Sequence, residues 1–188
     1  YAFLSVNTRG HDFFSEFAVA GKEEVYKRIG NAYEKFEDCI VDIQTWMNWL
    51  GGNGFSSIVL QGHSLGAPKV AYYLAQNPDT AVEKLVLLSP ADMVGLAEVE
   101  TYHKDLYEEA QNLVASGMKS KLLSHKLWAE YYLSASTYLD FFTRGNPIDA
   151  FNLYSDEPSN TLLKITTPTF IAFGEKDDAV IGPVQDTI

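Results

Sequence analysis

The chain has 188 residues, of which 46% are hydrophobic and 21% charged, as is usual for one soluble globular domain with a sizeable core. Its 14 basic and 25 acidic residues give a net charge of −11, which repels phosphate backbones and argues against nucleic acid as a partner. Cys39 is the single cysteine, so an intramolecular disulfide is excluded and a reducing compartment is expected. Neither a 20-residue apolar stretch nor a basic signal-peptide start is present. We therefore expect a cytoplasmic protein without stable membrane insertion.

Strand and helix patterns alternate along the first part of the chain. An apolar run over residues 1–6 predicts a strand, which leads into a turn at 7–12. Apolar residues at three- and four-residue steps predict a helix over 22–50, and the glycine cluster 51–54 ends it. The β-branched run at 57–60 predicts a second strand, buried on both faces.

The alternation continues and is then interrupted. Helical spacing at 65–76 is followed by a strand pattern at 85–88, which together favour a parallel sheet with helices on both faces. Residues 91–164 show amphipathic helices and no strand, and this block is too long to be a connecting loop. A strand at 169–173 then resumes the sheet. The fold class predicted is α/β with a helical cap insertion.

The domain organisation follows from this interruption. Residues 1–90 are expected to form the first part of the core and 91–164 the helical cap. Residues 165–188 would return to the core as one more strand and its loop.

A serine lies between two glycines where the second strand meets its helix. Gly62-His63-Ser64-Leu65-Gly66 is a G-x-S-x-G sequence, in which a sharp turn forces the serine into strained backbone angles. Side chains at Gly62 and Gly66 are expected to collide with the neighbouring strand and helix. The turn would hold the Ser64 hydroxyl clear of the sheet, with the backbone N–H of Leu65 beside it as an oxyanion donor.

The alternative interpretation of this motif is an ordinary surface turn, because a pattern with only three fixed positions also occurs by chance. The deciding context is a strand before the serine and a helix after it. Both patterns are present here, which favours Ser64 as a nucleophile.

On these residues the chain resembles the α/β-hydrolase superfamily, in its esterase and lipase branch. Gly62 to Gly66 is similar to the nucleophile elbow, the turn at 7–12 to the turn after the preceding strand, and Gly174-Glu175-Lys176-Asp177 to the loop that carries the acid. The resemblance implies a Ser-His-acid hydrolase in which Asp177 orients a histidine. Asp178 is the rival acid.

The chain departs from the family pattern at both ends. The family's histidine follows the acid, but none of the eleven residues after Asp177 is a histidine, so we expect it after Ile188. The second oxyanion N–H donor is expected before Tyr1, which makes the chain a middle section of the fold. Such a section should leave an imidazole-sized gap between Ser64 and Asp177.

The four histidines present are weak candidates for the base. We expect His11 to be a turn residue and the ring of His63 to pack beneath the elbow. His103 and His125 belong to the cap, where surface or interface positions explain them best. His125 is the second choice as a base, because a cap can fold over the serine.

The sequence therefore predicts a serine hydrolase that cleaves a carboxylic ester, or a thioester or amide, through an acyl-enzyme on Ser64. The substrate would be a small molecule with an apolar acyl or alcohol part. An acyltransferase or C–C hydrolase of the same superfamily, and a non-catalytic small-molecule-binding homologue, remain open, as does the oligomeric state. No cofactor or metal is expected, because the glycine cluster 51–54 precedes its strand and no metal-ligand spacing occurs.

Overall fold

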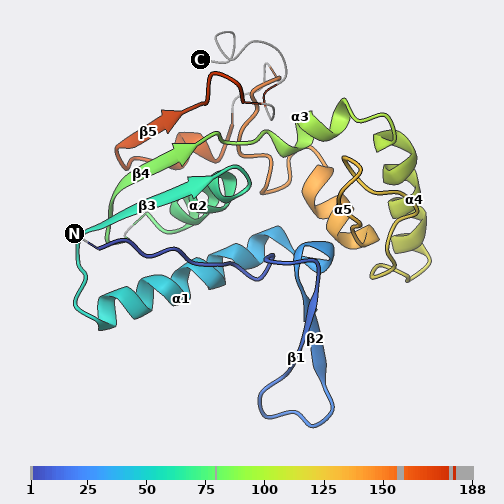
Figure 1. The fold of residues 1–188 in the computed structure, drawn as a ribbon, viewed down its shortest axis with the longest axis horizontal. Helices are drawn as coiled ribbons and strands as arrows, with labels where there is room; N and C mark the ends of the chain where they lie inside the picture. Colours follow the sequence, from blue (N-terminus) through green and yellow to red (C-terminus); the bar gives the residue numbers. More distant parts are fainter. Residues whose placement is uncertain (1, 79, 156–158, 178–179, 181–188) are drawn as a thin grey trace.

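The centre of the fold is a three-stranded parallel sheet in the order β3-β4-β5 (Figure 1). The computed structural model describes residues 2–78, 80–155, 159–177 and 180. The strands are β3 (Ile58–His63), β4 (Val82–Leu88) and β5 (Thr169–Ala172). The parallel sheet predicted from the sequence is confirmed, with β3 two residues longer and β4 three residues longer than expected.

One face of this sheet is covered by helix α2 (Gly66–Gln76), and α1 (Cys39–Gly52) packs against α2. The apolar positions of α2 recur at helical spacing and are buried: Ala67, Val70, Ala71 and Leu74. They meet the side chains of β3 and β4 that point to the same face. The helix predicted over 65–76 is confirmed to within one residue.

The opposite face of the sheet corrects the sequence prediction. Val59 and Phe170 point to this face and are 58% and 61% exposed, so β3 is not buried on both faces. Side chains alternate along a strand, and Gln61 and His63 are also exposed there. Since α1 and α2 pack against each other on one side, no helix in the described ranges covers the other.

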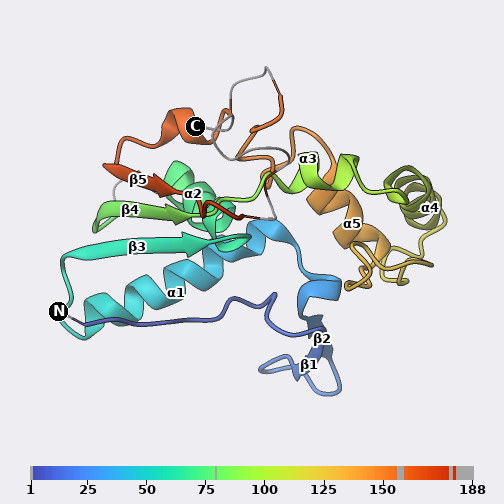
Figure 2. The same ribbon diagram turned by 45° about the horizontal axis from the view of Figure 1, so that its top comes forward.

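A β-hairpin replaces the first half of the helix predicted over 22–50. Strand β1 (Ser15–Ala18) pairs antiparallel with β2 (Tyr26–Ile29), and the hairpin extends away from the body in both views (Figures 1 and 2). The 3₁₀ turns η1 (Asn31–Tyr33) and η2 (Phe36–Asp38) then lead into α1. The spacing of buried residues predicted for this helix agrees with the structure only from Phe36 onward.

The strand predicted at 1–6 is also absent from the described residues. Residues 2–7 are extended and exposed but join no ladder (Figure 1), and Tyr1 lies outside the described residues. The turn that follows is fixed by Arg9, whose guanidinium donates to Asp42 Oδ1 at 2.7 Å and to Asp38 Oδ2 at 2.6 Å.

Between β4 and β5 the chain forms a helical block, of which residues 93–142 lie beyond the carboxyl ends of the strands (Figure 2). It contains α3 (Met93–Glu98), α4 (His103–Ala115), α5 (Ala135–Phe142) and η3 (Leu162–Lys164), and no strand among its described residues. Of the face predicted to be apolar, Leu106 and Leu113 are buried, whereas Val99 and Val114 are exposed. None of the helices described in the chain combines the length and apolarity that crossing a bilayer requires.

Candidate active site

Ser64 occupies the junction of β3 and α2 in a strained backbone conformation. Its φ is 50°, in the left-handed region that a non-glycine residue rarely adopts, whereas Leu65 is already helical with φ −57°. The Ser64 N–H donates to Leu88 O of the neighbouring strand at 3.0 Å, and the Ala67 N–H donates to Ser64 O at 3.0 Å. The geometry predicted for Ser64 is confirmed.

The two glycines beside the serine have different roles. A Cβ on Gly62 would lie 2.7 Å from the Cα of Ala67 and still closer to the carbonyl of Gly66, so only glycine fits there. A Cβ on Gly66 would meet no described atom within 4 Å. The predicted collision is therefore confirmed at Gly62 and wrong at Gly66, whose position at the start of α2 faces open space.

The hydroxyl of Ser64 and the N–H of Leu65 have no hydrogen-bond partner among the described residues. Ser64 is partly exposed, and its Oγ forms no hydrogen bond with another described residue. Leu65 is the N-cap residue of α2, and in the described ranges no carbonyl or side chain accepts a hydrogen bond from its N–H. A helix N-terminus with unused N–H groups favours negative charge.

Asp177 follows β5, on the same edge of the sheet as Ser64. Its N–H donates to Gly174 O at 3.2 Å in a tight turn, and its side chain is partly buried. Because β3, β4 and β5 are parallel, β3 and β5 end at the same edge of the sheet, about 10 Å apart at two strand spacings. The rival acid Asp178 lies outside the described residues.

None of the four histidines forms a hydrogen bond with Ser64 among the described residues. His11 lies 3.5 Å from Asp12 in the turn, and His103 Nδ1 lies 2.9 Å from the Tyr138 hydroxyl. His125 is exposed and pairs with the adjacent Ser124 rather than with the elbow. His63 is exposed, which corrects the expectation that it packs beneath the elbow, because it lies on the uncovered sheet face.

A buried ion pair anchors α2 close to its start and was missed by sequence reasoning. Lys69 Nζ donates to Glu34 Oε1 at 2.5 Å and to Thr8 Oγ1 at 3.1 Å. Burial raises the pKa of Glu34, against the opposing effect of Lys69. A Cβ on Gly10 would overlap the Glu34 carboxylate, so the glycine admits this contact. The available signal was a lysine within the apolar pattern of α2.

A second missed group connects the start of the helical insertion with the segment after α5. Asp92 follows β4, is buried, and accepts the Gly95 N–H at 2.8 Å as the cap of α3. Arg144 Nη1 lies 3.9 Å from Asp92 Oδ1, and Arg144 Nη2 donates to Glu98 Oε2 at 2.6 Å. Burial raises the pKa of Asp92, whereas Arg144 opposes that rise.

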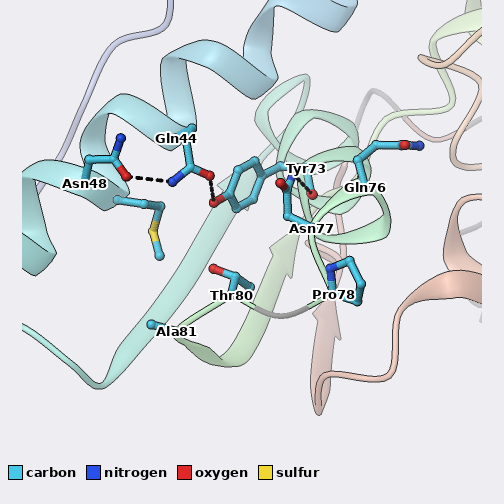
Figure 3. A pocket seen from close by; sticks show the side chains of 9 residues that line it. Gln44, Asn48, Tyr73, Gln76, Asn77, Pro78, Thr80 and Ala81 are labelled. Atoms are coloured by element: carbon cyan, nitrogen blue, oxygen red, sulfur yellow. Dashed lines mark hydrogen bonds between the residues drawn. The ribbon is translucent and has the colours of Figure 1, made fainter.

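Two cavities lie at opposite edges of the sheet. The larger, about 470 Å³, opens between α1 and α2 at the amino edge, where Tyr73 donates to Gln44 and Gln44 to Asn48 (Figure 3). It is remote from the strand ends that carry Ser64. The smaller, about 330 Å³, adjoins the carboxyl ends of β4 and β5. Its described lining residues are Pro90, Phe151, Leu153, Leu162, Ile171, Ala172 and Phe173.

No protein-family model matches this chain, and no curated protein shows significant sequence similarity to it. The resemblance to α/β hydrolases therefore stays a prediction from the sequence. The described side chains include no cluster of three or more histidine, cysteine, aspartate or glutamate residues arranged to hold a metal ion.

Proposed function

We propose that this chain carries the nucleophile of a serine hydrolase that cleaves a carboxylic ester, or a thioester or amide, through an acyl-enzyme. The observation that supports this most is Ser64 with φ 50° between β3 and α2, held against Gly62. Strain of this kind persists only where the surroundings impose it, and it is frequent at active sites. The mixed α/β fold with a parallel sheet is compatible with the proposal.

The chemistry assigned to the elbow is acyl transfer in two steps. The Ser64 oxygen attacks the substrate carbonyl carbon while its proton passes to a base, and the N–H of Leu65 donates to the oxyanion that forms. Collapse of the tetrahedral intermediate breaks the ester bond, and the base returns the proton to the departing alcohol. Water then attacks the acyl group on Ser64, releases the acid and restores the hydroxyl.

The acid and the base belong to the same proposal. Asp177 would accept a hydrogen bond from a histidine ring and hold it towards Ser64. None of the four histidines forms a hydrogen bond with Ser64 among the described residues.

Covalent labelling tests the nucleophile. A fluorophosphonate should add one phosphonyl group to the full-length protein at Ser64, located by peptide mass spectrometry, and hydrolysis of a 4-nitrophenyl ester should fall at least 10³-fold in Ser64→Ala. Ser89→Ala is a matched control, because Ser89 also has positive φ, 43°, after the adjacent strand and also donates its N–H to the next strand, but lies outside the G-x-S-x-G sequence. This control should keep its activity within about twofold.

Two results would reject the proposal. One is ester hydrolysis that is unchanged in Ser64→Ala, and the other is labelling of Ser64 no faster than that of Ser89. A folded protein that binds esters without cleaving them would instead identify a non-catalytic binding protein.

A further inference from the structure

The smaller cavity has the chemistry of an acyl-chain site. Every described side chain that lines it is apolar, and they come from the segment after β4, the segments after α5, and the end of β5. A cavity of about 330 Å³ is in the range of small-molecule sites, which are mostly apolar with a few polar groups at one end. Within the described lining, no such polar group is present to recognise a headgroup.

Backbone hydrogen bonds connect this cavity to the nucleophile. The Ser64 N–H donates to Leu88 O at 3.0 Å, and the Ser89 N–H donates to Ala172 O at 2.7 Å. Pro90 and Ala172, both in the lining, thus lie at the ends of the two strands next to the elbow. The cavity is displaced from Ser64 by one to two strand spacings, about 5–10 Å, along the same edge.

The volume gives the amount of an acyl chain that the cavity can hold. At roughly 30 Å³ for each water-sized group, the cavity holds about ten such groups. An acetyl group attached to Ser64 would not reach it, since its methyl carbon is one bond from the carbonyl. Because a chain must first span the distance from Ser64, an acyl chain of about six or more carbons is needed to enter the cavity.

We propose that this cavity binds the acyl chain of an ester with about six or more acyl carbons, whose carbonyl is attacked by Ser64. This inference rests on the proposed hydrolase function and specifies its substrate class. Each methylene that leaves water on binding should raise kcat/KM about fourfold.

Substitutions that fill the cavity test the proposal. The ratio of kcat/KM for 4-nitrophenyl octanoate to that for the acetate is measured on the full-length protein. Leu162→Phe should lower this ratio at least tenfold, because Leu162 lines the cavity. Leu163→Phe is the matched control, since Leu163 is the next residue of η3 and is 73% exposed, and it should leave the ratio unchanged. Ala172→Val provides a smaller change on another wall and should lower the ratio too.

Binding of octanoate by calorimetry separates this proposal from the hydrolase assignment. Octanoate should bind the wild type and Ser64→Ala equally, and at least tenfold more weakly to Leu162→Phe. Octanoate binding without any Ser64-dependent hydrolysis would support the cavity as a chain-binding site and reject the proposed hydrolase function. Two results would overturn the acyl-chain site. One is Ser64-dependent hydrolysis in which neither Leu162→Phe nor Ala172→Val changes the octanoate-to-acetate ratio of kcat/KM. The other is octanoate that binds Leu162→Phe as tightly as the wild type.

Discussion

Replacing Gly62 and Gly66 separately by alanine should have opposite effects on stability. At Gly62 the new Cβ would lie 2.7 Å from Ala67 Cα, whereas carbon atoms normally approach to about 3.5–4.0 Å, so the elbow must open by about 1 Å. Overpacking of this kind costs ~1–3 kcal/mol, and here rigid backbone opposes it. At Gly66 no described atom lies within 4 Å of the new Cβ, and helix formation should gain about 0.5–1 kcal/mol.

The two variants should therefore differ by about 2–4 kcal/mol in free energy of unfolding. Urea denaturation measures this difference, provided that the dependence on urea is the same for both. A displacement of Ser64 by about 1 Å should also lower kcat/KM about 10²-fold in Gly62→Ala alone. Equal stabilities for the two variants, or a larger loss in Gly66→Ala, would refute the packing described for the elbow.

The buried titratable groups give two further predictions. Burial lowers the pKa of His103 below its ordinary 6.5, so neutral His103 contributes stability above about pH 6.5 that is lost as the pH falls through the lowered value. His103→Gln should flatten the decline of the melting temperature between pH 7 and 5, and an unchanged slope would contradict this. Burial raises the pKa of Cys39 to about 12, so its thiol should react with Ellman's reagent at pH 8 only after denaturation. One thiol reacting within minutes in native buffer would exclude the buried position.

The elements that sequence predicted well are those in which local pattern and tertiary environment agree. The apolar run at 57–60 is typical of a strand, and the spacing of apolar residues from Ala67 to Leu74 is typical of a helix. The bounds of β3 and α2 agree closely with these two patterns. The position of Ser64 follows directly, because the junction of such a strand and helix leaves only a few residues for the turn. Asp177 follows in the same way, since parallel strands end at one edge.

The elements that sequence missed depend on contacts between distant residues. The segment before Cys39 carries helix-compatible spacing, yet residues 15–29 form a hairpin, with the Glu16–Arg28 ion pair across it. The exposed face at Val59 could not be read from an apolar run, because burial depends on which helices lie above it. The pairing of Lys69 with Glu34 spans 35 positions and leaves no periodic signal.

The strained conformation of Ser64 shows how these long-range contacts matter to the elbow. A pentapeptide in an exposed loop would relax to ordinary angles, because nothing would oppose the change. Here the strand next to β3 accepts the Ser64 N–H, and the helix after the serine packs on Gly62. That helix is in turn anchored by Lys69, whose charge is paired with Glu34 in the interior. Removing one charge of a buried pair costs about 3–5 kcal/mol, because the remaining charge is left buried without a partner. The motif becomes an elbow only because β4 and the segment around Glu34, distant in sequence, hold both sides of the turn.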